Sequence, residues 1–209
     1  MNSLRVMKKM VIFASGSGTN AENIIKYFEN KEVATVVAVF SNNPNAQVLE
    51  RAKRFNIPSE VFSKVELFES KVLQKLNSLQ PDLIVLAGFL LKMPKNIIES
   101  YPNKIINIHP ALLPKYGGTG MYGMNVHKAV VENKEKETGI SIHFVDENYD
   151  EGNIIFQESV LVLETDSPEN VAEKIHELEQ KFFPELIEKL LTPGSQLTAS
   201  NSQLPTSNF

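Results

Sequence analysis

The chain has 209 residues, of which 42% are hydrophobic and 22% charged, a composition typical of a globular protein with one domain and a sizeable core. Its net charge of −4 argues against nucleic acid as the main partner, and the absence of cysteine excludes disulfides and thiolate chemistry. No apolar run reaches the roughly 18 residues that span a membrane, and no signal peptide is evident. We therefore expect a cytoplasmic protein without a membrane partner.

Short apolar runs alternate with segments of helical spacing along the first half of the chain. A segment with helical spacing follows each of the first two apolar runs, the second of these segments reaching about residue 52. A third segment with helical spacing extends from Val65 to Leu79. This alternation is typical of βαβ units, and it predicts an α/β fold with an open, mostly parallel sheet and helices on both faces. The strand-like runs are 10–14, 33–40, 59–62, 82–89 and 104–108.

The second half of the chain has a different pattern. Two strand-like segments, 138–145 and 153–163, are joined by an acidic island and predict a late antiparallel strand pair. A long helix is predicted from Ser167 to Leu191, with Ser167 as its N-cap and a proline at the first helical position. Residues 192–209 carry no charge and predict a disordered polar tail. The expected organisation is an N-terminal extension (1–9), one domain (10–191) and this tail (192–209).

The first predicted strand ends in a glycine-rich turn, residues 15–20, that leads directly into a helix. The N–H groups of Gly18, Thr19 and Asn20 would point toward an anion at the helix N-terminus. The turn lacks the Lys-Ser/Thr of a P-loop and the third glycine of a dinucleotide fingerprint. It therefore predicts either a phosphate site or a tight turn in which Thr19 caps the helix.

Polar side chains follow another strand-like run at Asn107 and His109. The two residues flank Ile108, so they project to the same side of their strand, at the sheet edge where ligands bind in open α/β folds. The functional interpretation needs a carboxylate to stabilise protonated His109, and the alternative is that both residues only cap the loop. Spacing alone does not choose among the acids of the island, which are Asp146, Glu147, Asp150 and Glu151.

The remaining histidines have ordinary interpretations. His127 follows the glycine-rich segment 117–124 and could cap a helix, whereas His143 alternates with apolar residues in a strand and His176 lies on the exposed side of the last helix. A metal site needs three or four converging ligands, and no metal-ligand motif is present. We expect no metal.

Several of these segments, taken together, are characteristic of one protein family. From Met10 to about Leu191 the chain resembles the folate-dependent formyltransferase family. The family's NIHPxLLP segment with a downstream D-x-G is present, and an SGxGTN turn selects the branch that uses glycinamide ribonucleotide. The matching segments are SGSGTN (15–20), VFSN (39–42), VLAGF (85–89), INIHPALLPKY (106–116), TGISIHFV (138–145) and DEGNII (150–155).

The resemblance implies a Rossmann-like formyltransferase fold, 10-formyltetrahydrofolate as co-substrate, and roles for individual residues. Positions of the family's catalytic trio are matched by Asn107, His109 and Asp150. Positions that hold the ribonucleotide and its phosphate are matched by Gly18, Thr19, Asn20 and Glu179. Positions that line the folate pocket are matched by Lys64, Leu90, Leu91, Lys92, Met93 and Asn107, with Lys64 in place of a common arginine. Segment 117–124 departs from the family by being longer and richer in glycine.

The implied reaction is a direct attack of the ribonucleotide amine on the formyl carbon, through a tetrahedral intermediate. In this interpretation protonated His109 and the Asn107 amide stabilise the oxyanion, and Asp150 keeps His109 protonated. Alternatives are a formyltetrahydrofolate hydrolase, a formyltransferase with another acceptor such as methionyl-tRNA, or a non-catalytic nucleotide-binding module. The first two would carry an additional domain, which we do not expect here. The chain is expected to be a monomer or a homodimer.

Overall fold

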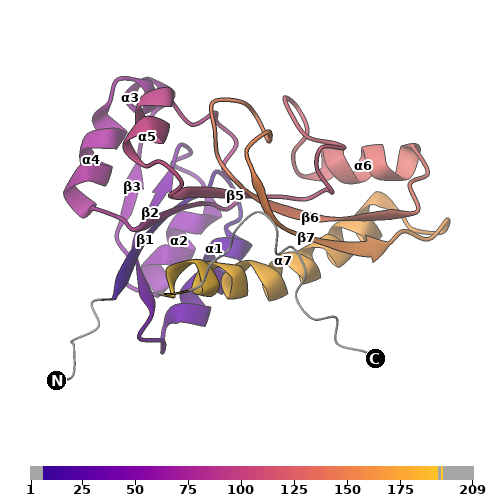
Figure 1. The fold of residues 1–209 in the computed structure, drawn as a ribbon, viewed down its shortest axis with the longest axis horizontal. Coiled ribbons are helices and arrows are strands. Elements are labelled where there is room, and N and C mark those ends of the chain that lie inside the picture. The colour runs from indigo at the N-terminus through magenta and orange to yellow at the C-terminus, as the bar shows by residue number, and fades with distance from the viewer. Residues whose placement is uncertain (1–6, 193, 195–209) are drawn as a thin grey trace.

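The computed structural model describes residues 7–192 and Gly194, and it contains one seven-stranded sheet (Figure 1). Along the sheet the strands lie in the order β3-β2-β1-β4-β5-β6-β7. All pairs from β3 to β5 are parallel, whereas β5–β6 and β6–β7 are antiparallel, so the predicted fold class is confirmed. The strands are β1 (Lys8–Phe13), β2 (Ala34–Ser41), β3 (Ser59–Val61), β4 (Leu83–Leu86), β5 (Ile105–His109), β6 (Glu137–Phe144) and β7 (Ile154–Leu161).

The alternation of side chains along β1 explains why helices cover both faces of the sheet. Met10 and Ile12 belong to one buried cluster, whereas Val11 and Phe13 belong to a second cluster. Residues of α1 (Thr19–Phe28), α2 (Gln47–Arg54), α6 (Met124–Glu132) and α7 (Pro168–Leu191) pack in the first cluster. Residues of α3 (Lys64–Phe68), α4 (Lys71–Leu79) and α5 (Lys95–Ser100) pack in the second. In Figure 1 the latter helices gather at one side, away from the long α7.

Several element boundaries differ from those predicted. Strand β1 begins at Lys8, inside the expected extension, because the Asp82 carboxylate binds both the Lys8 ammonium and the Lys9 N–H. The helix predicted from 65 to 79 is two helices, since Ser70 has a left-handed backbone with φ 68°. Helix α5 was not predicted. The predicted N-cap Ser167 is confirmed, and the predicted tail lies outside the described residues apart from Thr192 and Gly194.

The site lies where the order of strands reverses, between β1 and β4, which is the usual position of ligands in open α/β sheets. The loops after these two strands are joined by hydrogen bonds. The Ser15 N–H donates to the Gly88 carbonyl at 2.9 Å, and the Leu90 N–H donates to the Ser15 hydroxyl at 3.0 Å. The two loops therefore form one rim at the carboxyl edge of the sheet.

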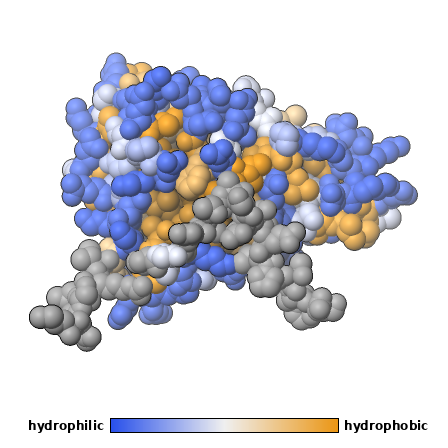
Figure 2. All heavy atoms as spheres, in the orientation of Figure 1, coloured by the Kyte–Doolittle hydropathy of each residue, from blue (hydrophilic) through white to orange (hydrophobic). Residues whose placement is uncertain are grey.

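The surface in the view of Figure 2 is mainly hydrophilic over α3 and α4, and hydrophobic residues come to the surface mostly along its central part. Over the described residues, no helix combines the length and the apolarity that a membrane span requires.

Candidate active site

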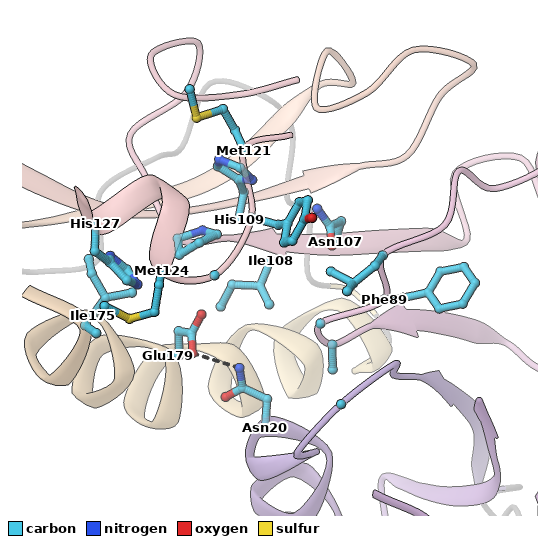
Figure 3. Close-up of a pocket in the computed structure, with 18 of the residues that line it drawn as sticks. Asn20, Phe89, Asn107, Ile108, His109, Met121, Met124, His127, Ile175 and Glu179 are labelled. Atoms are coloured by element: carbon cyan, nitrogen blue, oxygen red, sulfur yellow. Dashed lines mark hydrogen bonds between the residues drawn. The ribbon is translucent and has the colours of Figure 1, made fainter. Parts of the chain in front are cut away.

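One cavity of about 650 Å³ lies at the carboxyl ends of β1, β4 and β5, a size within the usual range for small-molecule sites. Its wall is formed by the turn after β1, the loop after β4, the end of β5, the segment 118–124 and one side of α7. Figure 3 shows Asn107 and His109 on one side of this cavity, and Asn20 with Glu179 on another. Residues far apart in the sequence therefore face a common space.

The glycine-rich turn after β1 and the first residues of α1 line this cavity. Gly18 is the N-cap of α1, its backbone is left-handed with φ 73°, and no side chain caps the helix. Thr19 is the first helical residue, so the alternative in which Thr19 caps the helix is wrong. The first N–H groups of a helix have no partner within the helix, and Gly18, Thr19 and Asn20 line the cavity. This geometry suits an anion.

Glu179 on α7 lies beside this turn, although 159 residues separate it from Asn20. The Asn20 amide donates to the Glu179 carboxylate at 2.9 Å, and the Gln180 amide donates to the Asn20 side-chain carbonyl at 2.9 Å (Figure 3). His176 lies 3.7 Å from Glu179, and its hydrogen bond to Glu179 raises the pKa of this half-exposed imidazole. This end of the cavity thus combines the N-terminus of α1 with the Glu179 carboxylate and the His176 imidazole.

The structure brings Asn107, His109 and Asp150 together. Asp150 Oδ1 lies 3.4 Å from the Asn107 amide nitrogen, and Asp150 Oδ2 lies 3.5 Å from His109 Nδ1. His109 Nε2 lies 2.7 Å from the Tyr116 carbonyl oxygen. His109 is only 3% exposed, so its ring is held almost wholly by protein groups. An amide, an imidazole and a carboxylate in contact can donate hydrogen bonds and transfer protons.

The backbone of the acidic island explains why Asp150, rather than a neighbouring acid, reaches this site. Asp150 has a left-handed backbone with φ 57°, a conformation that Asp tolerates better than most residues. Its Oδ2 accepts the Gly118 N–H at 3.0 Å. Gly152 follows in close contact with β6, where an added Cβ would lie 1.8 Å from the Phe144 carbonyl oxygen. The tight packing of this turn directs one carboxylate inward.

The charge states of Asp150 and His109 follow from burial and their neighbours. Burial acts to raise the pKa of Asp150, but the neighbouring His143 and His109 imidazoles and the Gly118 N–H outweigh it and lower that pKa. Burial lowers the pKa of His109 below its usual 6.5, although Asp150 and the Tyr116 carbonyl act in the opposite direction. At neutral pH the resting site therefore holds an ionised Asp150 and a mainly neutral His109. Asp150 favours the protonated form of His109, but burial of the ring acts against that form and has the larger effect.

His143 is a member of this site that its alternating sequence pattern did not reveal. In the β5–β6 pairing it lies directly opposite Asn107, and its Nε2 is 3.1 Å from the Asn107 amide nitrogen and 3.5 Å from Asp150 Oδ1. Its Nδ1 lies 2.8 Å from the Phe144 carbonyl. Since a carbonyl only accepts, Nδ1 carries the proton, and Nε2 accepts from Asn107. His143 therefore orients the amide of Asn107.

Only some of the residues matched to the folate pocket line the cavity. Leu90 lines it and is 50% exposed. Met93 is 3% exposed and packs in the second core cluster, while Lys64 begins α3. The chain turns away after Gly88, whose φ is 76°, so only the first residues of this loop face the cavity. The matched residues that are not among the lining residues are Lys64, Leu91, Lys92 and Met93.

The glycine-rich segment 117–124 forms part of the wall, a role that its composition alone did not predict. Gly118, Gly120 and Gly123 have positive φ angles, which lets this segment turn sharply beside the site. Met121 and Met124 line the cavity together with His127 from α6 (Figure 3). The sequence signal that could have found this role is the position of the segment, directly after the strand that carries His109.

His127 is expected to make the protein less stable in acid. It is 5% exposed, and burial lowers its pKa below 6.5. As the pH falls through about 6.5 the unfolded chain binds a proton that the folded chain resists, so the free energy of unfolding decreases. The loss between about pH 7.5 and pH 5.5, measured by urea unfolding, should be smaller in His127→Gln than in the wild type. His176→Gln is the contrasting control: its pKa is raised, so its removal should enlarge the loss. An equal loss of unfolding free energy in the wild type and both variants would contradict the lowered pKa of His127.

Among residues 7–192 and Gly194, no group of three or more His, Cys, Asp or Glu side chains is arranged to hold a metal ion.

Comparisons with known proteins agree with this geometry. Residues 8–187 match the family described as formyl transferase. A phosphoribosylglycinamide formyltransferase of Bacillus subtilis is 37% identical over 191 residues, which cover 88% of this chain and 95% of that protein. The chloroplastic enzyme of that name from Arabidopsis thaliana is also 37% identical, and the match spans 64% of its length. The crystal structure of the Bacillus halodurans phosphoribosylglycinamide formyltransferase has a TM-score of 0.81 and 36% identity, and the match covers 89% of this chain and 96% of that one. Since the family match covers most of the chain, this protein belongs to the formyl transferase family.

Proposed function

We propose that this protein transfers the formyl group of 10-formyltetrahydrofolate to the amine of glycinamide ribonucleotide, a reaction of purine biosynthesis. The observation that carries the proposal is the convergence of Asn107, His109 and Asp150 beside the N-terminus of α1 in one cavity. The transferases with which the chain shares over a third of its residues are named for this reaction. A hydrolase, or a module that only binds a nucleotide, is not favoured.

The charge states in the resting site suggest how protons move. The attacking amine must lose a proton once its nitrogen bonds to the formyl carbon, and neutral His109 beside ionised Asp150 can accept it. The imidazolium that forms would have both nitrogens facing acceptors, Tyr116 O and Asp150 Oδ2. When the bond between the formyl carbon and the folate nitrogen breaks, the same pair returns the proton to that nitrogen. No covalent enzyme intermediate is needed.

The Asn107 amide is the candidate donor to the formyl oxygen, which gains negative charge as the amine attacks. Of its two neighbours, His143 Nε2 is close at 3.1 Å, whereas the contact with Asp150 is long at 3.4 Å. The N–H group that makes the longer contact can turn to the oxyanion at little cost. A donor of this kind is typically worth about 2.7–4 kcal/mol in the transition state.

The two substrates would occupy different ends of the cavity. The N–H groups of Gly18, Thr19 and Asn20 suit the ribonucleotide phosphate, and the raised pKa of His176 adds positive charge nearby. Glu179 would accept hydrogen bonds from ribose hydroxyls. The pterin of the folate would lie against the loop after β4, where Leu90 is exposed and lines the cavity.

The proposal extends to the cellular location, oligomeric state and partners of the protein. We propose that the protein works in the cytoplasm, as a monomer or homodimer, without nucleic-acid or membrane partners. Its net charge of −4 supports the absence of a nucleic-acid partner. The Arabidopsis relative is named as chloroplastic.

A spectrophotometric assay of folate deformylation tests the proposal. Purified protein is incubated with 10-formyltetrahydrofolate, with and without glycinamide ribonucleotide. We expect turnover only when the ribonucleotide is present. Turnover without it would identify a hydrolase instead, and no turnover in either case would leave a binding module.

Glu179→Gln is expected to raise the KM for the ribonucleotide by about ten- to hundredfold, because an uncharged amide accepts weaker hydrogen bonds from the ribose. The kcat and the KM for the folate should change by less than about twofold, since Glu179 makes no hydrogen bond with Asn107, His109 or Asp150 among those described, and its charge is only a minor influence on the pKa of His109. Steady-state kinetics with each substrate varied in turn measure this. Glu173→Gln, an exposed position on the same helix that does not line the cavity, is the control. An unchanged KM would remove Glu179 from the ribonucleotide site.

A further inference from the structure

The orientation of His109 depends on one backbone carbonyl. The Tyr116 carbonyl oxygen lies 2.7 Å from His109 Nε2, and because a carbonyl only accepts, Nε2 carries the proton. The other ring nitrogen, Nδ1, is then the one that faces Asp150 Oδ2 at 3.5 Å. The hydrogen bond of one imidazole nitrogen commonly determines which tautomer is present. The position of the Tyr116 carbonyl therefore decides which nitrogen can exchange protons beside Asp150.

Tyr116 has a backbone that needs support. Its φ is 56°, a left-handed conformation that is unfavourable for a bulky residue and persists only where its surroundings hold it. The Tyr116 ring packs against the first core cluster, and its hydroxyl donates to Glu135 Oε1 at 3.0 Å. Glu135 lies between α6 and β6, and it is not among the residues that line the cavity. A carboxylate outside the site thus holds the residue whose carbonyl contacts His109.

From this chain of contacts we infer that Glu135 is a positioning residue for His109. Through the Tyr116 hydroxyl it keeps the Tyr116 carbonyl against His109 Nε2, and so fixes the tautomer and ring orientation that the proton transfer requires. Glu135 remains ionised in this role, because hydrogen bonds from Lys115 and Tyr116 lower its pKa. The inference rests on the proposed function only for its kinetic consequence.

Glu135 also accepts hydrogen bonds from Lys115, at 3.0 and 3.1 Å, but this contact contributes less to holding Tyr116 in place. The Lys115 side chain is 67% exposed, and ion pairs at such positions stabilise little. The Lys115 ammonium has no contact with His109 among the interactions described. Lys115→Gln is therefore a matched control that removes one partner of Glu135 and leaves the Tyr116 hydroxyl in place.

The test combines nitrogen NMR with steady-state kinetics on the full-length protein. Labelling histidine with ¹⁵N is practical because the chain has only 4 histidines, and a His109→Asn spectrum assigns the signal. In the wild type we expect the Nε2–H tautomer of His109. In Tyr116→Phe and Glu135→Ala we expect a mixture of tautomers, with kcat lowered by about three- to tenfold and both KM values within about twofold.

Two comparisons make the result decisive. Glu135→Gln retains an oxygen that can accept from the Tyr116 hydroxyl, so it should restore most of the wild-type tautomer, and Lys115→Gln should match the wild type. A wild-type tautomer in both Tyr116→Phe and Glu135→Ala would overturn the inference. The NMR measurement needs no substrate, so it stands even if the protein proves to have another acceptor, in which case only the kinetic comparison would be repeated with that acceptor.

Discussion

Replacing Asp150 by asparagine is expected to lower kcat by about 10²- to 10⁴-fold, the range that a group acting in proton transfer contributes. The variant removes the negative charge that would stabilise an imidazolium at His109, 3.5 Å away. It keeps an oxygen that can still accept the Gly118 N–H. Because the shape and most hydrogen bonds remain, the KM values of both substrates should change little.

Steady-state kinetics of Asp150→Asn and of a matched control measure this effect. Asp146→Asn makes the same chemical change four residues earlier in the same acidic island, at a side chain that accepts the Asn148 N–H and does not line the cavity. The control should retain wild-type turnover. Near-wild-type turnover in Asp150→Asn itself would remove this carboxylate from the mechanism.

Gly18→Ala is expected to damage both the fold and the ribonucleotide site. An added Cβ would lie 2.4 Å from Val48 Cβ and Cγ2 and 2.8 Å from Val48 Cα, and the φ of 73° is unfavourable for alanine. Overpacking of this kind costs about 1–3 kcal/mol and the left-handed backbone roughly 1–2 kcal/mol more. We therefore expect the free energy of unfolding to fall by about 2–5 kcal/mol and the KM for the ribonucleotide to rise more than about tenfold.

Urea unfolding and steady-state kinetics test this prediction, with two comparisons. Gly16→Ala is the stability control, because no atom lies within 4 Å of its added Cβ. The double variant Gly18→Ala, Val48→Ala should recover part of the lost stability, since it removes the side-chain clash but keeps the unfavourable φ. If Gly18→Ala were as stable as Gly16→Ala, the close packing of this turn on α2 would not matter.

The fold was predictable where the apolar pattern is strong. Runs such as 33–40 and 104–108 are strands because they are largely buried on both faces of the mostly parallel sheet, and their positions shift by only a residue or so in the structure. The break at Ser70 was not predictable, because the apolar spacing continues across it and only its left-handed backbone separates α3 from α4. Helix α5 is short, with six residues, and carries too few turns for a periodic signal.

The site was predictable in part for similar reasons. Asn107 and His109 stand out because polar side chains interrupt an apolar strand. Residue spacing does not show which acid of the acidic island reaches His109. That choice depends on the backbone conformation of the island, in which Asp150 is left-handed. The role of His143 depends on the β5–β6 register, and the neutral state of His109 depends on its burial. Both are properties of tertiary structure.

We expect the formyl group to pass directly from the folate to the ribonucleotide amine in this cavity. A single-turnover experiment with 10-formyltetrahydrofolate labelled in the formyl group, excess enzyme and glycinamide ribonucleotide tests it most directly. We predict that label appears in the formylated ribonucleotide at the same rate as the folate is deformylated, with none bound to the protein. Label released as formate, or retained on the enzyme, would contradict the account.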